Sequence, residues 1–183
     1  MAYENSVATP LRQLPNALTI VRFAAIPLFV VLLVRDQDGP SWPAGIVFGL
    51  AAITDQLDGW LARRWRVESA FGKVADPLAD RLMIDVSVVL LVAYDRLPWV
   101  ALVILLRDLL LVGGYKIVVP RGYEFEVSRL GKAATWGLYA SLALVLVTER
   151  GTWWPLALFW VSLALAVVAA GQYVLKARRE VRR

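Results

Sequence analysis

Four aspartates stand in a short polar stretch of a chain that is otherwise rich in apolar residues. Asp55 and Asp58 are three residues apart, and Asp76 and Asp80 are four residues apart. On a helix, residues at these spacings lie on one face. Converging carboxylates repel one another unless cations neutralise them, and the chain has neither histidine nor cysteine to supply other ligands. The pattern therefore predicts a site for hard cations that prefer oxygen ligands, such as Mg²⁺ or Mn²⁺.

Small and basic residues next to the first aspartate pair indicate that a bulky ligand approaches there. Gly59 lies four residues after Asp55, and Ala62 lies four residues after Asp58, so each leaves room beside a carboxylate. Glycine inside a helix costs about 1 kcal/mol relative to alanine, which suggests a need for close approach. Arg63 follows, and a guanidinium group binds phosphate through two parallel hydrogen bonds. These residues predict a ligand that carries phosphate.

A simpler interpretation is that the aspartates are solvated carboxylates at helix ends, placed to suit the helix dipole. A single aspartate would fit that interpretation equally well, but four at these intervals between apolar segments favour the metal site. Asp85 is a separate case, because it lies about one turn beyond Asp80 and four residues after Arg81. Ionisable residues at such depth usually pair, and we expect Asp85 to pair with Arg107.

The elements that position these residues are predicted to be membrane-spanning helices. The chain of 183 residues is 59% hydrophobic and 19% charged, whereas soluble domains average about 45–50% and about 25%. A spanning helix needs about 20 apolar residues, and six stretches fit: 16–35, 42–62, 74–94, 97–119, 130–148 and 152–175. Short connections make consecutive helices antiparallel neighbours. We expect an all-α integral membrane protein, with six transmembrane helices in a single bundle.

The distribution of basic residues predicts the orientation of this bundle. Lys and Arg are concentrated at the aspartate-rich loop and at the chain ends, and cytoplasmic segments carry such an excess. Both termini and the site are therefore expected to face the cytoplasm of a multi-pass cell membrane protein. The chain reads as one domain over 1–183, with a possible interfacial helix over 1–14 and a basic cytoplasmic tail over 176–183. Its pI near 9.8 fits contact with anionic lipid, and no nucleic-acid partner is expected.

The aspartate stretch also resembles the signature of the CDP-alcohol phosphatidyltransferases. The residues at the fixed positions of that signature are Asp55, Asp58, Gly59, Ala62, Arg63, Gly72, Asp76 and Asp80. Three further segments, "LPNALTIVR", "RDLLLVGGY" and "LGKAAT", are similar to segments of the branch that makes phosphatidylglycerol phosphate and cardiolipin. The resemblance implies six transmembrane helices, a homodimer, and transfer of a phosphatidyl group from CDP-diacylglycerol to an alcohol with release of CMP.

The resemblance also implies roles for individual residues. Two divalent metal ions, Mg²⁺ or Mn²⁺, would be held by Asp55, Asp58, Asp76 and Asp80. Asp80 would in addition be the base that accepts the proton of the acceptor hydroxyl. The CDP-lipid site would be lined by Gly59, Ala62, Arg63 and Gly72. Asn16 and Thr19 are candidate contacts to the donor nucleotide, with polar packing at a helix start as the alternative.

The acceptor alcohol is less well specified. Basic residues that could bind an acceptor phosphate are Arg107, Lys116, Arg121, Arg129 and Lys132, and all except Arg107 would serve equally well as interface anchors. The phosphatidylglycerol phosphate synthases resemble Arg-Glu where this chain has Arg107-Asp108, and tend to carry a lysine where it has Ala134. Arg-Asp resembles cardiolipin synthases. The pattern narrowly favours phosphatidylglycerol as acceptor, with glycerol 3-phosphate close behind and inositol phosphate third.

Two other classes of protein were weighed against an enzyme. A transporter or channel also carries buried acids, but it would spread them along several helices toward the middle of the membrane. Here the acids gather at one end of two consecutive helices, beside an arginine and small residues. A membrane scaffold needs no such residues at fixed intervals, so the enzyme interpretation is preferred.

Overall fold

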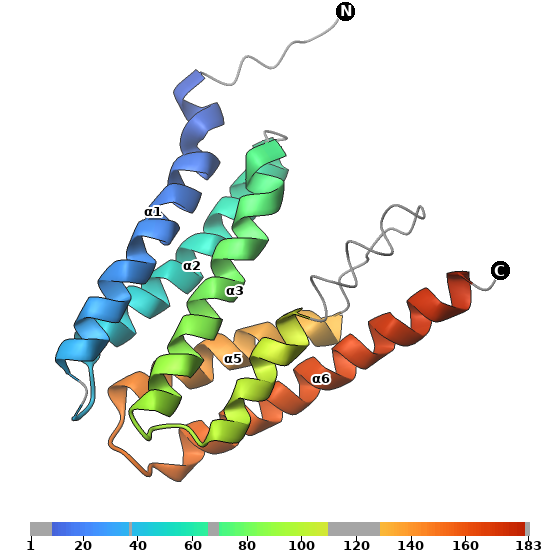
Figure 1. Cartoon of the computed structure of the whole chain (residues 1–183). Helices are drawn as coiled ribbons and strands as arrows, with labels where there is room; N and C mark the ends of the chain where they lie inside the picture. The colour runs from blue at the N-terminus through green and yellow to red at the C-terminus, as the bar shows by residue number, and fades with distance from the viewer. Residues whose placement is uncertain (1–8, 37, 66–69, 110–128, 182–183) are drawn as a thin grey trace, which may run out of the picture.

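The computed structural model describes residues 9–36, 38–65, 70–109 and 129–181, and within them the side chains of 17–36, 38–54, 78–79, 81–109 and 130–172. All regular secondary structure of the described chain is helical (Figure 1). Its elements are α1 (Thr9–Arg35), α2 (Trp42–Trp65), α3 (Ala70–Ala93), the 3-10 helix η1 (Trp99–Leu102) with a helical continuation over 103–109, α5 (Arg129–Val147) and α6 (Trp153–Val181). The all-α prediction is confirmed.

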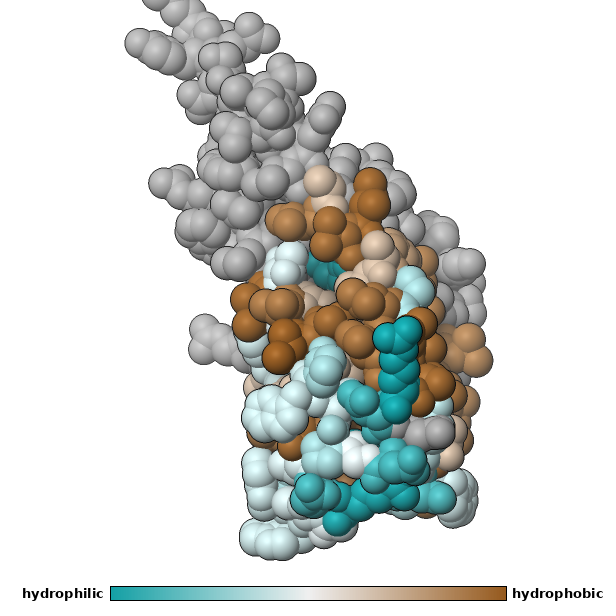
Figure 2. Space-filling model, turned by 90° about the vertical axis from the view of Figure 1, so that its left-hand side faces the viewer, coloured by the Kyte–Doolittle hydropathy of each residue, from teal (hydrophilic) through white to brown (hydrophobic). Residues whose placement is uncertain are grey.

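Three of these helices contain stretches long and apolar enough to cross a membrane: Ala17–Arg35, Leu130–Val147 and Trp153–Gln172. The apolar part of α2, Trp42–Thr54, is shorter. Figure 2 shows hydrophobic side chains over the middle of one face, and hydrophilic ones gathered at the end where the helix connections lie. This distribution suits a protein that lies in a bilayer.

The helix bounds differ from the prediction at both ends of the chain. The sequence predicted a possible interfacial helix over 1–14 ahead of the first span, but α1 runs from Thr9 through Pro15 without a break. Residues 9–14 are therefore part of α1, and residues 1–8 lie outside the described chain. Helices of membrane proteins tolerate proline because neighbouring groups satisfy the freed carbonyls. At the other end, α6 continues to Val181.

The helices pack in two groups. In Figure 1, α1, α2 and α3 run alongside one another, and α5 and α6 form a pair that lies at a steep angle to them. Aromatic rings join the groups, because Phe48 of α2 contacts Phe29 of α1 at 5.8 Å and Tyr139 of α5 at 5.4 Å between ring centroids. Gly137 lets α5 approach α6, since a Cβ at this position would clash with Ser162.

A buried arginine holds the connections at the end of the bundle opposite the α2–α3 loop. Arg96 donates hydrogen bonds to the backbone carbonyls of Gly39 (2.7 Å), Val145 (2.6 Å), Leu146 (3.5 Å) and Thr148. We call this arrangement the Arg96 clamp. Burial lowers the pKa of the Arg96 guanidinium below its usual value, because a charged group loses solvation there. The clamp satisfies carbonyls at the end of α5 that have no partner within the helix.

Candidate active site

The predicted metal ligands lie at one end of two consecutive helices. Asp55 and Asp58 belong to the last part of α2, and Asp76 and Asp80 to the first part of α3. Their side chains lie outside the described residues, so their coordination stays a prediction. Among the side chains that are described, no group of three or more acidic residues could hold a metal ion. The donor set itself, four carboxylates in a chain without imidazole or thiol, fits Mg²⁺ or Mn²⁺.

The predicted residues of the CDP-lipid site share this end of the bundle. Gly59, Ala62 and Arg63 lie on α2 between Asp58 and the end of the helix, and Gly72 lies in the first turn of α3. Their side chains, like that of Asn16 on α1, are outside the described part. Thr19 is described and is fully buried, which fits the alternative of polar packing near the start of the helix.

A buried arginine that we did not single out from the sequence lies on the same face of α1 as Thr19. Arg22 is 1% exposed, and it precedes Phe29 by seven residues, while Asp55 follows Phe48 by seven. Because Phe29 contacts Phe48 across antiparallel helices, Arg22 lies at the level of the Asp55 backbone. The signal available in the sequence was an arginine three residues after a threonine, inside an apolar helix.

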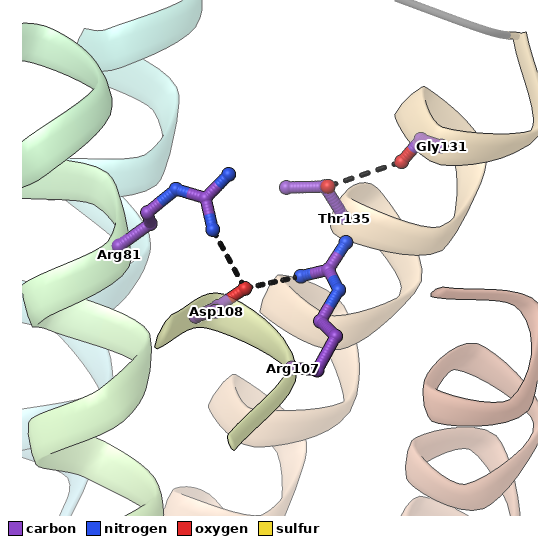
Figure 3. A network of polar contacts seen from close by, with 5 residues as sticks. All are labelled: Arg81, Arg107, Asp108, Gly131 and Thr135. Atoms are coloured by element: carbon purple, nitrogen blue, oxygen red, sulfur yellow. Dashed lines mark hydrogen bonds and ion pairs between the residues drawn. The ribbon is translucent and has the colours of Figure 1, made fainter. Parts of the chain in front are cut away.

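Arg81, which directly follows Asp80, takes part in a network of side chains around one carboxylate (Figure 3). Asp108 Oδ1 accepts a hydrogen bond from Arg81 at 2.8 Å and another from Arg107 at 2.7 Å. Asp108 is 4% exposed, whereas the side chains of Arg81 and Arg107 are 33% and 16% exposed. We call these three residues the Asp108 cluster. It ties α3 to the helical segment 103–109, and Thr135 of α5 lies beside it.

The predicted pair between Asp85 and Arg107 is wrong. Arg107 bonds instead to Asp108, the next residue along the chain, which reaches it without crossing between helices. Asp85 lies close enough to interact electrostatically with Asp108, Arg81 and Arg107. Its Oδ1 atom is buried and has no hydrogen-bond partner among the residues that the structure describes.

Of the five candidate acceptor-binding residues, two have described side chains. Arg107 lies inside the bundle in the Asp108 cluster, whereas Lys132 is exposed near the start of α5. Lys116, Arg121 and the side chain of Arg129 lie outside the described residues. Ala134 is fully buried on α5, so a lysine at this position would have to place its charge inside the bundle.

Comparison with known proteins supports the resemblance. A family model described as CDP-alcohol phosphatidyltransferase matches residues 12–168. A cardiolipin synthase (CMP-forming) of Streptomyces coelicolor is 35% identical over 180 residues, which cover 88% of this chain and 84% of that protein. CDP-diacylglycerol--glycerol-3-phosphate 3-phosphatidyltransferases of Bacillus subtilis and Pseudomonas fluorescens are 29% and 35% identical. These alignments cover 89% and 86% of this chain, and 94% and 83% of the two relatives.

Proposed function

Because the chain belongs to the CDP-alcohol phosphatidyltransferase family, we propose that it transfers a phosphatidyl group from CDP-diacylglycerol to glycerol 3-phosphate and releases CMP. The family match carries this proposal, since it spans all four aspartates together with Arg107 and Asp108. Family membership also favours an enzyme over a transporter, because the family is one of transferases. Two of the three relatives above are named for glycerol 3-phosphate as acceptor. Phosphatidylglycerol, which the sequence narrowly favoured as acceptor, therefore becomes the second candidate.

The aspartates would hold two divalent cations, whose charge would neutralise the diphosphate of the donor and stabilise the attacking and leaving oxygens. Asp80 accepts the proton of the acceptor hydroxyl, which then attacks the phosphorus on the lipid side. A carboxylate within hydrogen-bond reach of a hydroxyl can serve as such a base. The donor is held by Gly59, Ala62, Arg63 and Gly72, with Asn16 and Thr19 from α1.

The same proposal includes a place in the membrane. Three apolar helices of spanning length support an integral membrane protein, and we extend this to six spans with both termini and the site on the cytoplasmic side. The excess of basic residues at that side supports the orientation. A homodimer is proposed on the family resemblance.

Phosphatidylglycerol is the second candidate acceptor, which would make the protein a cardiolipin synthase. The relative from Streptomyces coelicolor, at 35% identity, carries that name. This chain has the buried Ala134 where the phosphatidylglycerol phosphate synthases tend to carry a lysine, and it has Arg107-Asp108 where they resemble Arg-Glu. The alanine leaves one cation fewer inside the bundle, and an acceptor with less charge needs fewer cations.

Both candidates are tested with protein purified in detergent and supplied with CDP-diacylglycerol and Mg²⁺ or Mn²⁺. Parallel reactions contain glycerol 3-phosphate, phosphatidylglycerol or inositol phosphate, and matched samples contain EDTA. CMP release and lipid products are measured by mass spectrometry. We expect metal-dependent formation of phosphatidylglycerol phosphate. Cardiolipin as the product would establish the second candidate, and the absence of metal-dependent CMP release with every acceptor would contradict the proposed function.

A further inference from the structure

The arginines of the Asp108 cluster have hydrogen-bond donors that the described chain does not use. A guanidinium group has five N–H donors. Within the described residues, Arg81 and Arg107 each donate one hydrogen bond to a protein group, and both bonds end on Asp108 Oδ1. Arg107 Nε is buried and has no partner there. Buried donors in native proteins usually have an acceptor, so a ligand with several acceptor oxygens would complete the cluster.

The charges of the cluster specify the kind of ligand. Two guanidinium groups contact one carboxylate. Asp85 interacts electrostatically with all three residues, but no ion pair joins it to either arginine in the described structure. Like charges that share a buried region repel one another strongly, and an anion bound at the unused donors would offset the repulsion between the two arginines. A phosphate monoester carries about −1.5 to −2 at pH 7, whereas the phosphodiester of a lipid carries less. The cluster therefore suits an alcohol that bears a phosphate monoester.

The position of the cluster suits the acceptor rather than a distant regulatory anion. Arg81 directly follows Asp80 on α3, so the cluster adjoins the proposed base along the helix. Asp108 approaches from the segment 103–109, and Thr135 lies on α5 next to Arg107 (Figure 3). An acceptor held between these three elements would be bound on the inner side of the aspartate end.

We propose that Asp108 is a positioning residue, which holds Arg81 and Arg107 together so that their remaining donors bind the phosphate of glycerol 3-phosphate. This rests on the proposed function, because it assigns one part of that site. Asp108 itself does not contact the substrate. It fixes the separation of two flexible, mutually repelling side chains before the acceptor arrives, and such preorganisation lowers the free-energy cost of binding.

The test compares Asp108→Asn and Asp108→Glu with the unchanged enzyme, measuring kcat and the KM of each substrate separately. Loss of the carboxylate charge, which weakens the hydrogen bonds from both arginines, is expected to raise the KM for glycerol 3-phosphate about tenfold or more in Asp108→Asn, with the KM for CDP-diacylglycerol unchanged. Asp108→Glu keeps the carboxylate and should stay within about threefold. Ser87→Ala is the matched control, because Ser87 is buried on α3 and bonds only within its own helix, to Met83.

A second variant keeps the test valid if Asp108→Asn fails to fold, as thermal unfolding would reveal. Arg81 is partly exposed, so Arg81→Gln should fold, and it is expected to raise the same KM, with Arg81→Lys closer to normal. Glycerol 3-phosphate should also raise the melting temperature of the unchanged enzyme, and raise it less in Asp108→Asn.

Three results would overturn the inference while leaving the proposed function intact: an unchanged or lower acceptor KM in Asp108→Asn, an equal rise in both KM values, or an equal thermal shift in both proteins. A lower acceptor KM would mean that Asp108 competes with the phosphate for the arginines. If the unchanged enzyme uses phosphatidylglycerol and ignores glycerol 3-phosphate, the proposed function fails first, and the inference fails with it.

Discussion

The Arg96 clamp and the Asp108 cluster both bury arginine, but they use its donors differently. Arg96 donates to four backbone carbonyls contributed by two separate parts of the chain. Arg81 and Arg107 meet at one oxygen of one carboxylate. Backbone carbonyls are fixed by the fold and carry no net charge. The clamp therefore holds two helix connections together and has a structural role. Two guanidinium groups that share one carboxylate keep donors that the described chain does not use, and an anion-binding site needs such donors.

The comparison of the Arg96 clamp with the Asp108 cluster shows that burial of an arginine does not by itself indicate function. Its partners do: both terminal nitrogens of Arg96 donate to backbone carbonyls, whereas Arg81 and Arg107 each give one hydrogen bond to a single carboxylate oxygen. The buried Nε without a partner in the described chain does not distinguish the two regions, because Arg96 and Arg107 both have one. The two regions should therefore respond to different measurements, the clamp to unfolding and the cluster to substrate binding.

The largest expected effect is the loss of activity in Asp80→Asn, and the same substitution at Asp95, at the other end of the molecule, is its control. Asp80→Asn should lower CMP release about a thousandfold or more, since it removes a proposed metal ligand and base together. Asp95→Asn, next to the Arg96 clamp, should leave activity and stability nearly unchanged. Asp95 is exposed and has φ +53°, a conformation that asparagine tolerates. Substantial turnover by Asp80→Asn in a folded protein would remove Asp80 from the base role.

The clamp is broken by Arg96→Met. Several carbonyls lose their donor, and the free energy of unfolding should fall by about 3 kcal/mol. The KM values of the folded protein should stay the same. Arg35→Met is the control, because Arg35 is exposed at the end of α1, and surface changes usually stay within about 0.5 kcal/mol. A normal unfolding temperature for Arg96→Met would show that water replaces the clamp without cost.

Helix α5 reaches both regions, with Thr135 beside the Asp108 cluster and Val145 in the Arg96 clamp. Gly137→Ala forces α5 away from Ser162, and such overpacking should cost about 1–3 kcal/mol in unfolding free energy. Gly49→Ala places the same methyl group where no atom lies within 4 Å, and it should be neutral or stabilise by about 0.4–1 kcal/mol. Equal stabilities would mean that the α5–α6 contact is looser than described.

The smallest expected effect is that of salt, which weakens ionic binding at the Asp108 cluster but not the hydrogen bonds of the Arg96 clamp. Raising the salt concentration shortens the Debye length from about 10 Å at 0.1 M to about 3 Å at 1 M. The partly exposed Arg81 should then bind anions more weakly, with a rise of about two- to fivefold in the KM for glycerol 3-phosphate. The stability contributed by Arg96 should change little, because its partners are neutral. A KM that does not depend on salt would speak against an ionic acceptor site.

The sequence was most informative where the pattern is local. The apolar stretches predicted the helices and placed Asp55 and Asp58 near the end of α2 and Asp76 and Asp80 near the start of α3. That each pair shares one helix face stays a prediction. It was least informative about partners distant along the chain. Asp85 was expected to meet Arg107 because both are deep, but only the packing of 103–109 shows that Asp108 is nearer. Arg96 looked like one basic residue in a short loop, since its carbonyl partners carry no sequence signal.

The Arg96 clamp also has a consequence for the order in which the protein assembles. Its partners at the end of α5 and directly after it lie 49 to 52 residues further along the chain. While the chain is being synthesised, α1, α2 and α3 can form before these carbonyls exist, and the guanidinium must stay in water. The clamp closes only after α5 has been made. A chain truncated before Val145 therefore contains all four aspartates but cannot form the Arg96 clamp at the opposite end of the bundle.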